Sequence, residues 1–195
     1  MLTEEFIDEL YRFLLSYQYD NAVENVFLQS KHAVFSHGID YKKMAEDKTY
    51  LDKVAQMAIL FAKFNKPLFG QISGGAKGAG AYMLSMMTMP WGCGDAFMKS
   101  DECSRGMVPL MGGTHRLARL PLKLGYYMAL VGDDFNAEEM AQLGFLKGYI
   151  HNDVSNSDIR KKFHETNLSF RDKYRYMDYD ENDALLEAEE KMKVE

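Results

Sequence analysis

A glycine-rich stretch at residues 70–87, GQISGGAKGAGAYMLSMM, constrains the fold of this chain more than any other segment. It follows an apolar run and precedes residues rich in Met, Tyr and Leu, which are typical of a helix. Glycine at a strand-to-helix junction indicates a backbone that approaches another group closely, or dihedral angles that other residues avoid. Three partners fit such a loop: a nucleotide phosphate, an acyl oxyanion or a neighbouring helix.

Phosphate binding is disfavoured by the spacing of these glycines. A dinucleotide fingerprint that uses Gly78 and Gly80 needs a third glycine where this chain has Met83. A P-loop needs Ser or Thr directly after its Gly-Lys pair, whereas Lys77 is followed by Gly78. Two explanations stay open, namely an oxyanion hole made of backbone amides and close packing of helices.

Helical and strand patterns alternate ahead of the glycine-rich stretch. They comprise a helix capped by Thr3 with apolar positions Phe6, Leu10, Phe13, Leu14 and Tyr17, a strand at 25–30, a Gly-containing loop at 33–40, a helix at about 50–65 and a buried strand at 67–73. This order is typical of an α/β domain with parallel strands. Ligands of such domains bind where the strands end, and both loops are expected there.

The C-terminal half of the sequence is predicted to be more helical. A segment starts near Pro121, Gly132 interrupts it, Asn136 caps another helix and Gly144 ends that helix. Residues 151–195 are charged and polar. We therefore expect a core over residues 1–150 and a charged helical C-terminal extension over residues 151–195.

Composition excludes several classes of function. The chain has 195 residues, of which 47% are hydrophobic, enough for one sizeable core. A net charge of -6 provides no overall basic field, so direct nucleic-acid contact is not expected to dominate. Cys93 and Cys103 lack the spacing of a metal site, and no apolar run is long enough to span a membrane. The acidic start of the chain is not typical of a signal or transit peptide.

Three ordered motifs carry a resemblance to a known family. They are F-x-x-G-x-D at 35–40, G-x-x-x-G-x-G at 74–80 and E-x-x-x-G-x-x-P-x-x-G-G-T at 102–114. With them the chain resembles the crotonase (enoyl-CoA hydratase/isomerase) superfamily, closest to its 3-hydroxyisobutyryl-CoA hydrolase branch. The resemblance implies an α/β fold, a spiral of β-β-α turns that lacks the first strands and carries a helical C-terminal region.

The resemblance also implies roles for individual residues. The amides of Ile39 and Ala79 correspond to the oxyanion hole, and Glu102 corresponds to the general acid/base glutamate. A coenzyme A thioester is then the substrate, with no covalently bound cofactor and no metal. The segment expected to contact coenzyme A comprises His37, Ile39, Asp40 and Tyr41. A single loop histidine is, however, more often an ordinary surface residue than a ligand-binding one.

Several residues depart from the family pattern. Hydratases carry a second glutamate where this chain has Tyr82, and the hydrolase branch carries an aspartate where it has Leu110. Lys77 replaces an apolar residue of the acyl pocket, and Asp101 replaces a proline. Pro90 falls in a predicted buried strand, where a missing N–H is poorly tolerated. With Tyr82 and Leu110 at these positions, neither alkene hydration nor thioester hydrolysis has the pair of carboxylates that relatives use.

Two functions from different classes follow from this mixture. One is an active acyl-CoA thioester hydrolase or enoyl-CoA hydratase that uses Glu102 and forms a homo-oligomer such as a trimer. The other is a degenerate subunit of a large mitochondrial assembly, such as the small subunit of the mitochondrial ribosome, held by other protein subunits. The departures favour the structural subunit, and the resemblance implies a mitochondrial location. The aromatic residues of the extension, Phe170, Tyr174, Tyr176 and Tyr179, favour an interface there.

Overall fold

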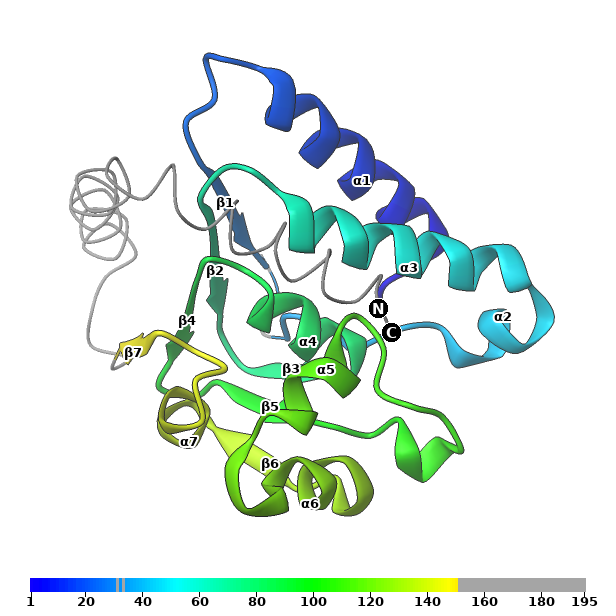
Figure 1. Ribbon diagram of the computed structural model, residues 1–195, viewed down its shortest axis with the longest axis vertical. Helices are drawn as coiled ribbons and strands as arrows, with labels where there is room; N and C mark the ends of the chain where they lie inside the picture. Colours follow the sequence, from blue (N-terminus) through cyan, green and yellow to red (C-terminus); the bar gives the residue numbers. More distant parts are fainter. Residues whose placement is uncertain (31, 33, 151–195) are drawn as a thin grey trace, which may run out of the picture. The chain divides into compact units, whose positions relative to one another are not determined.

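The computed structural model describes residues 1–30, 32 and 34–150. The predicted C-terminal extension lies outside these residues. The described helices and strands are, in order, α1 Glu4–Tyr19, β1 Val26–Gln29, α2 Tyr41–Glu46, α3 Lys48–Lys63, β2 Leu68–Ile72, β3 Gly75–Lys77, α4 Ala79–Ser85, β4 Met89–Cys93, β5 Phe97–Lys99, the 3-10 helix η1 Cys103–Arg105, α5 Gly113–Ala118, the 3-10 helix η2 Pro121–Lys123, α6 Leu124–Val131, β6 Asp134–Asn136, α7 Ala137–Gln142 and β7 Gly148–Ile150 (Figure 1).

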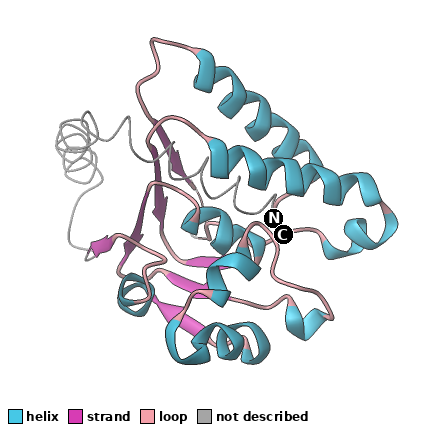
Figure 2. Cartoon of the chain, viewed as in Figure 1, coloured by secondary structure: helices cyan, strands magenta, loops and turns pink. Residues whose placement is uncertain are grey.

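The larger sheet contains four parallel strands in the order β1-β2-β4-β7 (Figure 2). Strand β2 is buried along its whole length, as expected for a parallel strand covered on both faces. Pro90 is accommodated in β4 because the pairing with β7 begins one residue later, at Trp91. The Pro90 carbonyl accepts a hydrogen bond of 2.8 Å from the amide of Lys147. The predicted alternation of helices with parallel strands is confirmed.

The smaller sheet joins the glycine-rich stretch to the segment that leads to Glu102. Strand β3 pairs in parallel with β5, and β5 pairs in antiparallel fashion with β6. An isolated parallel bridge between Ser36 and Ala76 adds the Gly-containing loop at residues 35–40 to the edge of β3. The sheet therefore brings together residues from three distant parts of the chain.

Helices α1 and α3 lie side by side (Figure 1). Thr3 caps α1 as predicted, because its hydroxyl accepts a hydrogen bond from the Phe6 amide. The predicted buried face was partly wrong. Ile7 and Leu14 are the buried residues of α1, whereas three expected members of that face are exposed: Phe6, Phe13 and Tyr17.

Helix α4 follows the glycine-rich loop and is almost wholly buried, in contact with β3 and α5 (Figure 1). Gly78, its N-cap, has φ +49° and ψ -130°, a backbone conformation that side chains disfavour. The later predicted helix ends are confirmed. Asn136 forms a capping box with Glu139, and Gly132 ends α6 with φ +70°.

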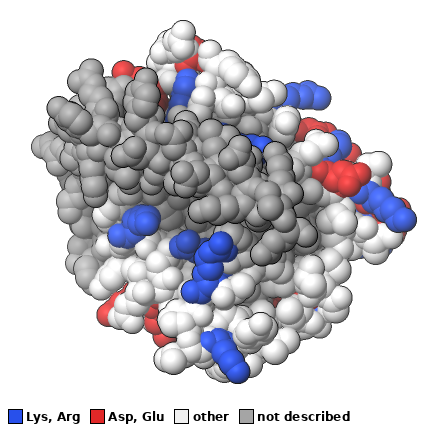
Figure 3. Space-filling model, in the orientation of Figure 1, with Lys and Arg blue, Asp and Glu red and all other residues white. Residues whose placement is uncertain are grey.

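Surface and hydropathy features of the described residues fit the composition. On the face shown in Figure 3, the described acidic and basic side chains are scattered rather than gathered in one patch. None of the helices in the described part of the chain combines the length and apolar character that a membrane-spanning helix requires.

Candidate active site

The first loop, residues 35–40, lies directly against the glycine-rich loop, residues 74–80. The amide of Lys77 donates a hydrogen bond of 2.9 Å to the carbonyl of Ser36. The amide of Phe35 donates one of 2.8 Å to the carbonyl of Gly75. These hydrogen bonds extend the smaller sheet into the first loop, so the first loop and the glycine-rich loop lie side by side.

Two glycines allow this close approach. A Cβ at Gly38, whose φ is +79°, would lie 3.1 Å from the carbonyl oxygen of Lys77. A Cβ at Gly80 would overlap the side chain of Ser36. The glycine content of both loops thus has a packing reason as well as a conformational one.

The amides of Ile39 and Ala79 are the two groups expected to form the oxyanion hole. No described residue accepts a hydrogen bond from either of them. The Ile39 side chain is 1% exposed and belongs to the hydrophobic core. Ala79 begins α4, where backbone amides are unpaired by the geometry of the helix. Convergence of the two amides on one substrate oxygen stays a prediction.

Glu102 lies beside the glycine-rich loop and is 0% exposed. Its Oε1 has no hydrogen-bond partner among the described residues. Its Oε2 lies 3.5 Å from the Ser100 hydroxyl, a long hydrogen bond. Burial raises the pKa of Glu102 to about 7, and the neighbouring charge of Asp101 adds to the increase. Glu102 can therefore hold or release a proton near neutral pH.

Tyr82 occupies the position of the second carboxylate of hydratases. It is 0% exposed, and its hydroxyl lies 2.6 Å from that of Ser100. Burial, followed by the charge of Glu102, raises the pKa of Tyr82, so the phenol stays neutral. A Cβ at Gly113 would lie 2.5 Å from the Tyr82 ring, so the glycine at 113 makes room for that ring.

A second polar cluster links the start of α2 to η1. The Tyr41 hydroxyl donates a hydrogen bond of 3.3 Å to Asp101. Arg105 donates two hydrogen bonds to the same carboxylate, at 3.2 and 3.0 Å, and its guanidinium lies 4.9 Å from the centre of the Tyr41 ring. We call these three residues the Asp101 latch. It ties the first loop to the residue that precedes Glu102.

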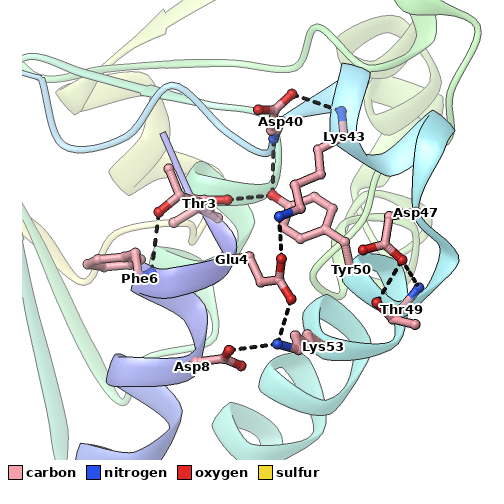
Figure 4. Close-up of polar contacts among 11 residues, drawn as sticks. Thr3, Glu4, Phe6, Asp8, Asp40, Lys43, Asp47, Thr49, Tyr50 and Lys53 are labelled. Carbon is pink, nitrogen blue, oxygen red and sulfur yellow. Dashed lines mark hydrogen bonds and ion pairs between the residues drawn. The ribbon is translucent and has the colours of Figure 1, made fainter.

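A hydrogen-bonded tyrosine holds the first loop from its other side (Figure 4). Tyr50, from α3, is 0% exposed, and its hydroxyl donates to the Leu2 carbonyl and accepts a 3.0 Å hydrogen bond from the Asp40 amide. The Asp40 carboxylate accepts from the Lys43 amide at 3.1 Å and so caps α2. In this structure the Asp40 amide and carboxylate both organise the loop.

Ion pairs connect the helices that surround the first loop (Figure 4). Glu4 pairs with Lys43 and Lys53, and Asp8 also pairs with Lys53 at 2.6 Å. These side chains are partly exposed, so each pair adds little stability. Together they connect α1, α2 and α3 around the first loop.

A cavity of about 640 Å³ opens beside the first loop. His37 lines it, as do residues of α1, β1 and α4. Ile39, Asp40, Tyr41 and Glu102 are not part of its lining. Among the described residues its lining comprises Met1, Leu2, Phe6, Leu28, Gln29, Ser30, His32, Val34, Phe35, Ser36, His37 and Met83.

Sequence reasoning missed three residues that shape this site: Ser100, Arg105 and Tyr50. Ser100 and Arg105 flank Glu102 closely in sequence, so a search of its neighbours for hydroxyl and basic side chains would have found them. Tyr50 lies in a different helix, and no sequence signal links it to the loop that it holds. Within the described residues, no group of three or more His, Cys, Asp or Glu side chains could hold a metal ion.

Comparison with known proteins places these features in a family. The sequence model of the enoyl-CoA hydratase/isomerase family matches residues 1–192. The mitochondrial enoyl-CoA hydratase of Pongo abelii is 29% identical over 149 residues, which are 74% of this chain and 51% of that protein. The 2,3-dehydroadipyl-CoA hydratase of Escherichia coli is 28% identical over 140 residues, which are 70% of this chain and 55% of that protein.

Solved structures agree on the fold. The enoyl-CoA hydratase of Bacillus halodurans superposes with a TM-score of 0.77 at 19% identity, covering 86% of this chain and 70% of that one. The enoyl-CoA hydratase/isomerase of Marinobacter aquaeolei gives a TM-score of 0.74 at 19% identity, covering 84% of this chain and 67% of that one. This chain spans about half the length of the curated relatives that it matches.

Proposed function

Because this chain belongs to the enoyl-CoA hydratase/isomerase family and has its α/β crotonase-like fold, we propose that it binds an acyl-CoA thioester and hydrolyses it with Glu102 as the only acid–base carboxylate. The observation that carries the proposal is the Glu102 carboxyl, which is fully buried and has one oxygen with no described partner. A buried carboxyl that can titrate near neutrality is costly for stability and is typical of active sites. Its place beside Gly78 puts it at the loop that the family uses for its substrate.

The proposed reaction uses one carboxylate and two amides. The Glu102 carboxylate removes a proton from water while the water oxygen bonds to the thioester carbonyl carbon. The carbonyl oxygen becomes negative and accepts hydrogen bonds from the Ile39 and Ala79 amides. The carbon–sulfur bond then breaks, and the thiolate takes the proton from Glu102. The products are a carboxylic acid and coenzyme A.

Alkene hydration fits this site less well. Hydration benefits from a second carboxylate, and the corresponding residue here is Tyr82, a neutral phenol already bonded to Ser100. Thioester hydrolysis was one of the alternatives that the sequence left open. The second carboxylate of the hydrolase branch is also replaced here, by Leu110, so the preference for hydrolysis rests on the neutral, hydrogen-bonded Tyr82 at the hydratase position. Which acyl group the chain accepts is part of the test below.

A structural role is the second candidate. It is supported by the separation of Glu102 from the lining of the cavity beside the first loop, and by Tyr82 and Leu110, which stand where relatives carry a second carboxylate. In this case the chain serves as a degenerate subunit of a larger mitochondrial assembly, such as the small subunit of the mitochondrial ribosome. The names of several matched relatives place those proteins in mitochondria and support that location.

The test is turnover by the full-length chain. The chain is incubated with 3-hydroxyisobutyryl-CoA or crotonyl-CoA, and release of free thiol is followed beside loss of the enoyl thioester. Thiol release that falls about 10²–10⁴-fold in Glu102→Gln, but not in the exposed control Glu9→Gln, supports the proposal. Absence of turnover, together with absence of thioester binding by calorimetry, would refute it in favour of the structural role.

A further inference from the structure

Three buried hydroxyl and carboxyl groups form a continuous chain behind the candidate active site. The Tyr82 and Ser100 hydroxyls are 2.6 Å apart, and the Ser100 hydroxyl donates to Oε2 of Glu102 at 3.5 Å. All three residues are at most 2% exposed. They come from α4 and from the segment that follows β5, so tertiary structure alone brings them together.

The number of hydrogens on each group decides which one donates in each of these two hydrogen bonds. A serine hydroxyl carries one hydrogen and a carboxylate carries none. When Glu102 is ionised, Ser100 donates to Oε2, so the Tyr82 hydroxyl must donate to Ser100. The other oxygen, Oε1, faces Gly78 and has no described partner. The two carboxylate oxygens thus have different surroundings.

We propose that Tyr82 and Ser100 are positioning residues that hold Oε2 of Glu102 and leave Oε1 to act on the substrate. In the hydratase pattern the residue at 82 is a second reacting carboxylate, whereas here it supports Glu102. The catalytic purpose of this arrangement rests on the proposed function, but the arrangement itself can be tested without turnover.

Other groups also influence Glu102, and they define the controls. Burial and then the charge of Asp101 raise the pKa of Glu102, and the backbone amides of Glu102 and Asp101 lower it. The pKa values of Tyr41 and Cys103 are raised by burial and then by the charge of Glu102. Arg105 faces Asp101 rather than Glu102. Loss of the Ser100 or Tyr82 hydroxyl leaves all of these groups in place. A change in Glu102 ionisation in these variants is therefore due to the lost hydrogen bonds among Tyr82, Ser100 and Glu102.

The experiment measures the ionisation of Glu102 in the full-length chain. Glutamate carboxyl carbons are labelled with ¹³C, and the Glu102 signal is assigned by its loss in Glu102→Gln. Ser100→Ala removes a hydrogen-bond donor to the ionised Glu102 carboxylate, so the midpoint of the Glu102 titration should move to higher pH. The expected change is roughly tenfold in the ionisation constant of Glu102. Tyr82→Phe should move it in the same direction by less, since it only weakens the Ser100 donor.

Matched controls identify a non-specific effect. Ser85→Ala removes a hydroxyl that donates to the Tyr82 carbonyl and takes no part in the hydrogen bonds to Glu102. This variant should leave the midpoint of the Glu102 titration unchanged. Tyr82→Phe keeps the ring that packs at Gly113, so it tests the idea even if Ser100→Ala does not fold. A Glu102 midpoint unchanged in folded Ser100→Ala or Tyr82→Phe would overturn the proposal. A shifted midpoint in a protein that shows neither turnover nor thioester binding would support the hydrogen-bond arrangement around Oε2 and refute the proposed hydrolysis.

Discussion

The carboxylate of Glu102 packs directly against the backbone of Gly78. A Cβ at Gly78 would lie 2.8 Å from Oε1 and 3.0 Å from the carboxyl carbon. The glycine therefore serves two needs at once, a positive φ of +49° and room for the candidate acid–base group. Both the backbone conformation of the loop and the position of the Glu102 carboxylate therefore depend on a glycine at residue 78.

Replacing Gly78 by alanine should destabilise the chain and displace Glu102. Gly106 provides a control for the positive φ alone, because its φ is +76° and nothing lies within 4 Å of a Cβ there, although its ψ is 21° and that of Gly78 is -130°. We expect Gly106→Ala to cost about 1 kcal/mol through backbone strain, and Gly78→Ala to cost about 1–3 kcal/mol more through its less favourable ψ together with overpacking. Urea unfolding of both variants measures the difference. Equal losses would show that the carboxylate does not restrict residue 78.

Stability should decrease as pH rises from about 5 to about 8. The Glu102 pKa is raised from 4.5 to about 7, so between these values the folded chain binds more protons than the unfolded chain. The loss should be on the order of 3 kcal/mol, and Glu102→Gln should remove this part of the pH dependence. Unfolding at several pH values checks it, with Glu9→Gln as control. An unchanged slope in Glu102→Gln would contradict the prediction.

The rate of the proposed thioester hydrolysis should rise with pH through about 7. The general base must be ionised, and burial keeps the Glu102 carboxyl protonated below that pH. The measurement is kcat/KM for 3-hydroxyisobutyryl-CoA from pH 5 to 9, in a range where the substrate is stable. A rate that is already constant at pH 5 would show that the reaction uses a different base.

Removing the Tyr50 hydroxyl should loosen the first loop. Tyr50→Phe leaves the Leu2 carbonyl and the Asp40 amide without their partner, at a cost of about 1–3 kcal/mol. Tyr19→Phe is the control, because Tyr19 is 74% exposed. Hydrogen exchange of the Asp40 amide should be faster in Tyr50→Phe. Unaltered exchange and stability would mean that the loop is held by its other contacts.

The Asp101 latch should show a measurable coupling energy. Asp101→Asn weakens the hydrogen bonds from Tyr41 and Arg105, and Tyr41→Phe removes one of them. A double-mutant cycle should give an interaction of about 0.5–2 kcal/mol between positions 41 and 101. Additive effects in unfolding experiments would indicate that the two residues do not support each other.

Local features of the fold were predictable because neighbouring residues encode them. The Thr3 and Asn136 caps, the strand at residues 25–30 and the ends of α6 and α7 depend on hydrogen bonds or backbone angles within a few residues. The ordered motifs likewise identified the family. The buried face of α1 was not predictable in full, because spacing along a helix does not say which side the rest of the chain covers.

The sequence by itself determined the long helices α1 and α3, the strands β1 and β2, the Asn136-capped helix, the glycine-rich segment and the position of Glu102 in a family motif, but not the short strands of the smaller sheet. Tertiary structure alone decided that Glu102 is buried, that Tyr82 and Ser100 support it, and that Pro90 fits in β4 because β7 pairs only from Trp91 onward. The physical reason is that burial, the pKa of a carboxyl and the partner of a hydroxyl depend on groups brought close by folding. Residues 82 and 102 come together only because α4 and the segment after β5 pack on one another.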